Sequence, residues 1–542
     1  MRISAPSENP SPRSSGTARQ FASARDARPA RALRRLRRLI APAAALAVAA
    51  GAMVVPSAAA DDAADLGGLD WAACPPAAMT APGTVCTDVE VPRDYADPEG
   101  ATITLTVSRV PATGERRGVI AGNPGGPGGD ALGMFSPEAV KMPDAVREHF
   151  DLLAVEPRGL RWGTPMNCNI ADIPTSGMAA GQFGAMYAAC ESNDPGYAGL
   201  VTTENTARDL DHVRGILGED RLNLYGLSYG TDLMGTYATL FPEATGRMVL
   251  DSSVDPAHRY FALGDAREPW RRDALNAMFQ WIADRDETYG LGTTPLQVYS
   301  RWSQRINEEV GAPGQVYPPP AQVGDVPAAL GSSEEGLTAL YDGILPALWR
   351  GHSFAASLVR PGAGGQSVLL QLTFAATYSE SEWPSIADAI VTGETPVPAP
   401  PEGVTEEDLL AMVESMTNVE RAIVCNDNVN PAQPERIPGA YLDQYTGGDI
   451  FRVNADAMAS GQLCLGWPGK SAAVELDGDA LESKPLLLHY DRDAAVTGTA
   501  GRAMQAAMGG ELIELPGYSH GVLDARNGAD EIADAVSAHY LG

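Results

Sequence analysis

The chain has 542 residues, of which 44% are hydrophobic and 20% charged, and its acidic residues outnumber its basic ones by 69 to 39. A formal charge of −30 makes nucleic acid and anionic lipid poor partners, because both require a positive protein surface.

Residues 1–60 have the composition of a secretory signal peptide. They contain ten arginines, no lysine and two acidic residues, Glu8 and Asp26, and an uncharged apolar stretch from Leu39 to Val55 precedes Ala58-Ala-Ala60. A basic region, an apolar region and a small-residue site predict cleavage after Ala60. A membrane anchor is the alternative, but the apolar stretch is short and alanine-rich for a membrane span.

The chain after residue 60 has a formal charge of −38, because residues 1–60 hold ten of the 39 basic residues and two of the 69 acidic ones. We expect a secreted, extracellular protein with no stable membrane association after cleavage. Its acidic surface is expected to tolerate or attract a cationic substrate, such as a peptide with a charged N-terminus.

All six cysteines follow residue 60, and an even number in an exported chain predicts disulfides. Proximity in the sequence favours three pairs among the possible connectivities: Cys74 with Cys86, Cys168 with Cys190, and Cys425 with Cys464. No Cys-x-x-Cys pair or tight Cys/His cluster occurs, so we expect no zinc site.

An apolar strand, Gly118–Gly122, leads into the glycine-rich segment Asn123-Pro-Gly-Gly-Pro-Gly-Gly129. So many glycines allow backbone N–H groups to face a ligand, and in an α/β-hydrolase this loop supplies one oxyanion donor. The N–H of Gly126, or that of Gly125, is the candidate. A flexible linker is the alternative, and a phosphate loop is disfavoured because no Gly-Lys-Ser/Thr follows.

The next strand, Phe150–Val155, ends in Glu156-Pro-Arg-Gly159. Alternating strands and helices predict a mostly parallel sheet, in which functional residues gather at the carboxyl ends of the strands. Glu156 and Arg158 therefore either line a site or form a buried structural ion pair.

The sequence Leu222-Asn-Leu-Tyr-Gly-Leu-Ser-Tyr-Gly-Thr231 is typical of a nucleophile elbow, in which a serine sits on a sharp turn between a strand and a helix. Helical periodicity over 205–217 and 231–241, followed by a strand at 247–250, provides the required context. Ser228 is the expected nucleophile, and the N–H of Tyr229 is the second expected oxyanion donor.

These features resemble the secreted tripeptidyl aminopeptidases, a family of α/β-hydrolases related to prolyl aminopeptidases. The resemblance extends over nearly the whole chain after residue 60. It implies release of short peptides, tripeptides above all, from free N-termini, without a cofactor. It rests on the Gly-Gly-Pro-Gly loop, Glu156-Pro-Arg-Gly159, Gly226-Leu-Ser-Tyr-Gly-Thr231, Met248-Val-Leu-Asp251, Ala422-Ile-Val-Cys-Asn-Asp427 and Cys464-Leu-Gly-Trp-Pro468.

Strand and helix cease to alternate over residues 256–470, where helical patterns alternate with proline-rich breaks at Pro318–Pro320 and Pro396–Pro401. We expect a large, mainly helical cap here, inserted between a first core part (61–255) and a second (471–542). Helices are predicted at 270–285 and 406–425, and their aromatic and methionine residues are assigned to the packing of the cap itself.

The second core part supplies the remaining catalytic candidates. An acid must follow the strand Pro485–Tyr490, and the family resemblance favours Asp493 over Asp491 because the acid of the family precedes a small-Val-Thr segment. The last strand, Glu511–Leu515, leads to His520 in a glycine-flanked loop, where the general base is expected.

The sequence thus predicts acyl transfer by Ser228, His520 and Asp493, with no metal or organic cofactor. An aminopeptidase also needs a carboxylate for the substrate ammonium group. Glu156, Asp255 and Asp427 are candidates, and an acidic residue of the cap is the alternative. Two other functions remain open: a carboxylesterase with the same three residues, and a secreted peptide-binding protein without catalysis.

Overall fold

The computed structural model describes residues 66–168, 181–326, 335–395, 400, 401, 403–469, 473–528 and 530–542. These residues belong to one unit that spans residues 40–542. The predicted signal peptide and residues 396–399 of the second proline-rich break lie outside the described residues. Within the described ranges, no helix combines the length and the apolar character needed to cross a bilayer.

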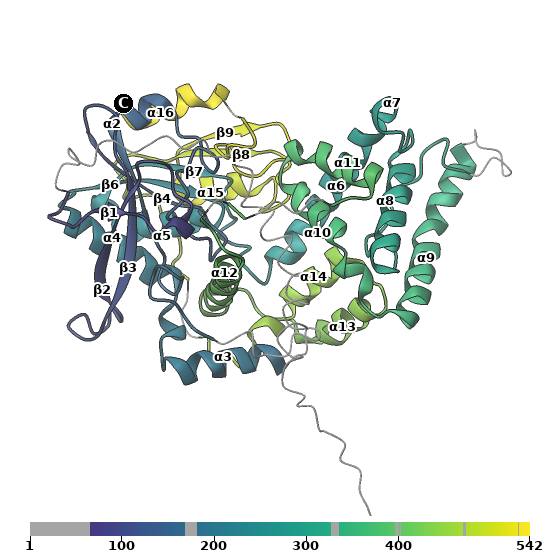
Figure 1. Cartoon of the computed structure of the whole chain (residues 1–542), viewed down its shortest axis with the longest axis horizontal. Helices are drawn as coiled ribbons and strands as arrows, with labels where there is room; N and C mark the ends of the chain where they lie inside the picture. Colours follow the sequence, from purple (N-terminus) through teal and green to yellow (C-terminus); the bar gives the residue numbers. More distant parts are fainter. Residues whose placement is uncertain are drawn as a thin grey trace, which may run out of the picture. The chain divides into compact units, whose positions relative to one another are not determined.

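The part of the chain that the structure describes is built on a nine-stranded sheet, in the order β1-β2-β3-β5-β4-β6-β7-β8-β9 (Figure 1). Three antiparallel strands come first, and β3 pairs antiparallel with β5; every later pair is parallel, which confirms the expected mostly parallel sheet. The strands are β1 (Ala72–Ala73), β2 (Val85–Pro92), β3 (Thr102–Val110), β4 (Gly118–Asn123), β5 (Phe150–Val155), β6 (Leu222–Leu227), β7 (Thr245–Asp251), β8 (Leu486–Tyr490) and β9 (Glu511–Leu515).

The strands predicted from apolar runs agree closely with those observed. β5 and β9 have the predicted bounds, and β4 is one residue longer. β7 begins at Thr245 and ends at Asp251, because these two residues pair with Leu222 and Leu227 of β6. Backbone pairing extends this strand beyond its apolar residues, and it brings an acidic side chain to the carboxyl edge of the sheet.

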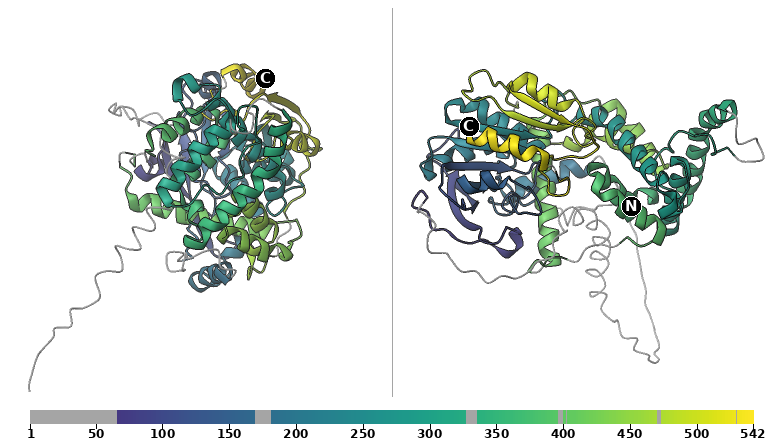
Figure 2. Two further views of the ribbon diagram at one scale, coloured as in Figure 1. Left: turned by 90° about the vertical axis from the view of Figure 1, so that its right-hand side faces the viewer. Right: turned by 90° about the horizontal axis from the view of Figure 1, so that it is seen from above.

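Helices cover both faces of the sheet because neighbouring strand residues point to opposite faces. Leu224 packs into a core with α4 (Thr203–Leu217), α5 (Tyr229–Leu240) and α15 (Ala500–Met508). Tyr225 packs on the other face with α2 (Asp144–His149) and α16 (Ala533–Leu541). Figure 2 shows α16, yellow and close to the C-terminus, lying on the strands.

Every element that the structure describes between β7 and β8 is helical, which agrees with the predicted cap (Figure 1). This segment, called the cap below, has a hydrophobic core of its own that contains Met278, Phe279, Trp302 and Trp383. Its α-helices are α6 (Leu263–Ala283), α7 (Asp286–Tyr289), α8 (Pro295–Val310), α9 (Glu335–Val359), α10 (Val368–Ala375), α11 (Trp383–Thr392), α12 (Glu406–Asp427), α13 (Ile437–Tyr445) and α14 (Ile450–Ala459). A further helix, α3 (Gly181–Asn193), precedes α4.

α6 begins two turns before the predicted helix, in spite of Pro269 within it. Its first turn packs against α14, where a Cβ on Gly264 would lie only 3.0 Å from the Cα of Ala455. This close contact between helices keeps the segment helical although its local sequence favours a break. α12 begins at the predicted residue because Thr405 and Asp408 form a capping box.

The three disulfides join the predicted pairs: Cys74 with Cys86, Cys168 with Cys190, and Cys425 with Cys464. The first joins Cys74, the residue that follows β1, to β2 at the edge of the sheet. The third connects the end of α12 to the segment that follows α14, so it lies within the cap.

Candidate active site

Ser228 occupies a sharp turn between β6 and α5, with φ 58° and ψ −125°. This backbone conformation is unfavourable for a residue with a side chain, and it is typical of functional turns. The turn also requires glycine on both sides: a Cβ on Gly226 would overlap the carbonyl oxygen of Gly230, and a Cβ on Gly230 would overlap that of Asn123. The sequence around Ser228 therefore forms the expected elbow.

Asp493 and His520 follow neighbouring strands, β8 and β9, and their side chains are in contact. Nδ1 of His520 lies 2.7 Å from Oδ2 of Asp493, and Oδ1 of Asp493 accepts a hydrogen bond from the N–H of Ala495 at 2.8 Å. The Asp493 carboxylate is fully buried. The hydrogen bonds from His520 and Ala495, one to each oxygen, orient this carboxylate towards the imidazole.

The two groups alter each other's pKa. Burial of His520 opposes protonation, but the charge of Asp493 and the hydrogen bond to it outweigh burial, so the pKa of His520 lies above its ordinary value. Burial of Asp493 likewise opposes ionisation, but His520 outweighs it and holds the pKa of Asp493 below its ordinary value. The geometry therefore favours an ionised carboxylate beside a basic imidazole.

Asp251, which sequence analysis did not assign to the site, connects the nucleophile to the loop of residues 516–524, the His520 loop. Its carbonyl oxygen accepts a hydrogen bond from the N–H of Ser228 at 3.0 Å. Its carboxylate accepts hydrogen bonds from the N–H groups of Val522 and Leu523 at 2.7 and 2.8 Å. The signal was present in the sequence, because Asp251 ends an apolar strand next to the elbow.

Three further groups hold the His520 loop. The N–H of Gly521 donates to Oγ of Ser252 at 2.8 Å, and Nδ2 of Asn527 donates to the carbonyl of His520 at 2.9 Å. The N–H of His520 donates to the carbonyl of Tyr378, a cap residue, at 2.8 Å. The cap thus makes a direct hydrogen bond to the residue that carries the imidazole.

The glycine-rich loop (residues 123–129) lies against the elbow. The N–H of Gly125 donates to Oδ1 of Asn123 at 2.9 Å, which engages this group within the loop. Gly126 lines the same pocket as Ser228 and Tyr229. Of the two glycines considered from the sequence, Gly126 is therefore the better placed to donate to an oxyanion beside Ser228.

Ser228 and His520 both line a pocket of about 380 Å³ between the carboxyl edge of the sheet and the cap. Helices α6, α12 and α14 contribute its cap wall, together with Tyr378. The lining residues are Gly126, Pro127, Ser228, Tyr229, Asp232, Val254, His258, Arg259, Tyr260, Leu263, Arg267, Tyr378, Glu420, Arg421, Val424, Asn454, Ala457, Met458, Leu463, Ala495, Val496 and His520.

None of the three acids predicted to bind an ammonium group lines this pocket. Oδ2 of Asp427 accepts a hydrogen bond from the N–H of Thr203 at 2.7 Å, at the start of α4. Asp255 lies next to the pocket, where its Oδ2 is 2.8 Å from Nδ1 of the lining residue His258. Glu156 is fully buried behind the glycine-rich loop. Glu420 and Asp232 are the carboxylates among the lining residues.

Glu156 belongs to a buried pair of carboxyl groups. Its Oε2 accepts a hydrogen bond from the N–H of Ala131 at 2.7 Å, and Asp130 forms an ion pair with Arg161 at 2.8 Å. Its other oxygen, Oε1, and Oδ1 of Asp130 are buried, and no N–H or O–H group of the described residues donates to either. Burial and the Asp130 carboxylate raise the pKa of Glu156 well above its ordinary value. A protonated Glu156 donates to Asp130 and satisfies both oxygens.

The buried ion pair between Glu156 and Arg158, which the sequence left open, does not form in the described part of the chain: Arg158 forms a buried structural ion pair with Asp209 instead. Its guanidinium donates to both carboxylate oxygens of Asp209 at 2.6 and 2.7 Å, and both side chains are fully or almost fully buried. The ion pair connects Arg158, in the segment that follows β5, to Asp209 of α4.

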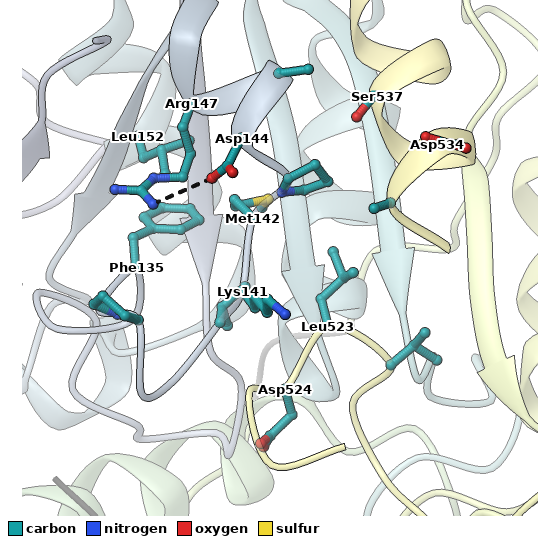
Figure 3. A pocket seen from close by; sticks show the side chains of 16 residues that line it. Phe135, Lys141, Met142, Asp144, Arg147, Leu152, Leu523, Asp524, Asp534 and Ser537 are labelled. Atoms are coloured by element: carbon teal, nitrogen blue, oxygen red, sulfur yellow. Dashed lines mark ion pairs between the residues drawn. The ribbon is translucent and has the colours of Figure 1, made fainter. Parts of the chain in front are cut away.

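A second hollow, of about 490 Å³, is lined in part by Leu523 and Asp524 of the His520 loop (Figure 3). Lys141 also lines it, together with Asp144 and Arg147 of α2, which form an ion pair at 3.8 Å. It contains neither Ser228 nor His520, so its larger volume does not make it the site. Among the described residues, no cluster of His, Cys, Asp and Glu is arranged to hold a metal ion.

Comparison with known proteins agrees with this geometry. A family model described as the alpha/beta hydrolase fold matches residues 121–288, from β4 to the start of the cap. The chain is 34% identical over 259 residues to tripeptidyl aminopeptidase of Streptomyces coelicolor, which covers 43% of this chain and 47% of the relative. These matches confirm the predicted α/β-hydrolase fold and the resemblance to tripeptidyl aminopeptidases, but the match to this relative covers 43% of the chain and not the nearly complete part after residue 60 that was expected.

Two further relatives come from Mycobacterium tuberculosis. Serine protease Hip1 is 34% identical over 211 residues, covering 35% of this chain and 40% of the relative. Carboxylesterase B is 30% identical over 253 residues, covering 43% of this chain and 48% of the relative. The chain thus spans about half the length of the curated relatives that it matches.

The buried carboxyl pair predicts how stability depends on pH. The folded chain retains the Glu156 proton above the ordinary pKa of 4.5, whereas the unfolded chain releases it. Stability therefore falls as pH rises from this value towards the raised pKa, by up to about 1.4 kcal/mol per pH unit. Glu156→Gln retains a donor for Asp130 and has no proton to lose. In chemical denaturation, the free energy of unfolding of this variant should increase relative to that of the wild type as pH rises above the ordinary pKa of 4.5.

The matched control is Glu115→Gln, which removes an exposed carboxylate from the same part of the chain. Its stability difference from the wild type should not change as pH rises above 4.5. A constant difference for Glu156→Gln as well would mean that Glu156 is ionised in the folded protein.

Proposed function

We propose that this α/β-hydrolase, a relative of tripeptidyl aminopeptidases, is an exported serine exopeptidase that releases short peptides from free N-termini through an acyl-enzyme. The observation that carries the proposal is the 2.7 Å contact of His520 with Asp493, with His520 and Ser228 lining one pocket. The names of two relatives, tripeptidyl aminopeptidase and serine protease Hip1, support a peptide substrate and tripeptides as products. Three disulfides support export to an oxidising compartment.

In the proposed first step, Nε2 of His520 accepts the hydroxyl proton of Ser228 while Oγ attacks the carbonyl carbon of the scissile bond. The N–H groups of Tyr229 and Gly126 donate to the oxyanion that forms. The imidazolium then gives its proton to the leaving amine, and an ester to Ser228 remains. A water molecule, deprotonated by His520, then attacks this ester. The bond to Oγ of Ser228 breaks, the imidazolium returns its proton to this oxygen, and the peptide carboxylate is released. Asp493 orients the imidazole and stabilises its charged form throughout.

The ammonium group of the substrate requires a carboxylate that faces the pocket. Asp232 is buried and already forms an ion pair with Arg259 at 2.5 Å. Glu420 is exposed on the α12 side of the pocket, so we assign it as the ammonium ligand. Asp255, which contacts the lining residue His258, is the second candidate.

A carboxylesterase is the other function that a specific observation favours. Val254, Leu263, Val424, Leu463 and Val496 give the pocket apolar walls that would accept an acyl chain. One relative also has the name carboxylesterase B. The same acyl-enzyme chemistry applies, and only the preferred leaving group differs, so comparison of kcat/KM for short acyl esters and peptides separates the two functions.

Ser228→Ala should lower kcat for peptides and esters alike by on the order of 10⁶-fold, because the nucleophile is lost. A fluorophosphonate should label the wild type at Ser228 and leave the variant unlabelled, as read by peptide mass spectrometry. Ser192→Ala, an exposed change on α3, is the control and should behave as the wild type. A wild type that neither turns over nor takes the label would be a binding protein.

The acid limb of the pH profile should lie above pH 6.5, because the pKa of His520 is raised from that value and the imidazole must be neutral to accept a proton. Asp493→Asn removes the charge that raises this pKa, so the limb should move to lower pH while kcat falls by about 10⁴-fold. The measurement is kcat/KM across the pH range. If the acid limb lies at the same pH for both proteins, the charge of Asp493 does not raise the pKa of His520.

Removal of the substrate charge should show whether the enzyme is an exopeptidase. Because a hydrogen bond between charged groups is lost, N-acetylation of a tripeptide amide should lower kcat/KM by roughly tenfold or more. Glu420→Gln should lower the ratio of kcat/KM for the free peptide to kcat/KM for the acetylated peptide towards one. Glu407→Gln, an exposed change on the same helix, should leave this ratio unchanged. Equal rates for free and acetylated peptides in the wild type would exclude recognition of a free N-terminus.

A further inference from the structure

The pocket that contains Ser228 has an excess of cationic side chains. Arg259, Arg267 and Arg421 line it against the carboxylates of Asp232 and Glu420. This is the reverse of the whole chain, in which acidic residues outnumber basic ones by 69 to 39. Arg259 is neutralised by Asp232, so the remaining charge is located on the cap wall of the pocket.

Arg267 extends from α6, one turn after the lining residue Leu263. Its Nη2 lies 3.2 Å from Sδ of Met458, a weak hydrogen-bond acceptor. Among the described residues, no carboxylate lies within ion-pair distance of Arg267. A guanidinium in a pocket wall that has only a thioether as its partner retains most of its capacity to donate hydrogen bonds.

α14 adds a neutral donor to this wall. Asn454 lies one turn before Met458 on the same side of α14, and both residues line the pocket. α14 packs closely against α6 at Gly264 and Ala455, and the contact of Met458 with Arg267 belongs to the same interface. The amide of Asn454 and the guanidinium of Arg267 therefore belong to one continuous surface of the pocket.

Arg271, one turn further along α6, adds positive charge behind this surface. Its guanidinium is buried, donates to the hydroxyl of Tyr378, and lies 4.4 Å from the ring centre of Phe374. Burial and the charge of Arg267 lower the pKa of Arg271 to about 9. Two guanidinium groups thus repel each other here, and an anion in the pocket would relieve that repulsion.

We propose that Arg267 and Asn454 form a subsite for a carboxylate of the substrate. This inference rests on the proposed peptidase function, and it adds a negative group to the ammonium that Glu420 is assigned to bind. Guanidinium and amide N–H groups match the two oxygens of a carboxylate. The carboxylate is either an acidic side chain of the peptide or the free C-terminus of a short leaving peptide.

Two sets of matched substrates distinguish these sources. In the first, tripeptidyl anilides carry Glu or Gln at each position in turn, with an uncharged leaving group. In the second, tetrapeptides with a free C-terminus are compared with their C-terminal amides. The wild type should favour the anion by roughly tenfold or more in kcat/KM in one of the two sets, and added salt should reduce the preference.

Arg267→Gln should reduce the ratio of kcat/KM for the anionic substrate to kcat/KM for its neutral partner to about one. Asn454→Ala should lower the same ratio, because the second hydrogen-bond donor is lost. The control is Arg301→Gln, an exposed change of the same charge on α8, which should retain the preference. Because the readout is a ratio within one protein, a variant with a lower overall rate remains informative. No preference in either set, or a preference that Arg267→Gln retains, would overturn the proposal.

Protection of Ser228 from a fluorophosphonate label by the same peptides tests the subsite independently of peptide cleavage. Anionic peptides should protect the wild type at roughly tenfold lower concentration than their neutral partners, and Arg267→Gln should remove the difference. Labelling and selective protection without peptide hydrolysis would refute the peptidase function alone. Hydrolysis and labelling without any such selectivity would refute the carboxylate subsite alone.

Discussion

The whole site depends on one constraint: the central strands are parallel, so their carboxyl ends meet at one edge of the sheet. β4 leads there into the glycine-rich loop, β6 into Ser228, β8 into Asp493 and β9 into His520. β7 lies between the nucleophile strand and the acid strand, and its last residue, Asp251, binds the backbone of both Ser228 and the His520 loop. A shift of one residue in the pairing of β7 would turn this carboxylate to the other face and leave the loop N–H groups without acceptors.

The cap contacts the His520 loop as well as forming one wall of the pocket. The carbonyl of Tyr378 accepts the N–H of His520, and the Tyr378 hydroxyl accepts a hydrogen bond from Arg271 of α6. α6 also carries Arg267 and packs on α14. Contacts in the wall of the pocket are thus continuous with contacts that position His520.

The sequence predicted the core well because the core follows local rules. Apolar runs marked the strands, and the Gly-x-Ser-x-Gly turn marked the nucleophile. The order of acid and histidine along the chain then pointed to Asp493 and His520, which the structure brings into contact.

Prediction was weaker where a residue's environment comes from distant segments. Glu156 ends a strand as a site acid would, yet its neighbours are Asp130, Ala131 and Arg161, and only their positions in space indicate a buried proton. Glu420, Arg267 and Tyr378 lie on cap helices whose patterns resemble ordinary packing, so no sequence signal indicated that they line the pocket.

The disulfide between Cys425 and Cys464 has a consequence for the assembly of the pocket. Val424 and Leu463, the residues that precede the two cysteines, both line the pocket, so the covalent bond ties together two parts of its wall that lie far apart in the sequence. A newly made chain whose thiols are still reduced lacks this tie and holds the wall by non-covalent packing alone. If the chain is exported as proposed, oxidation would complete the wall of the pocket only outside the compartment in which the chain was synthesised.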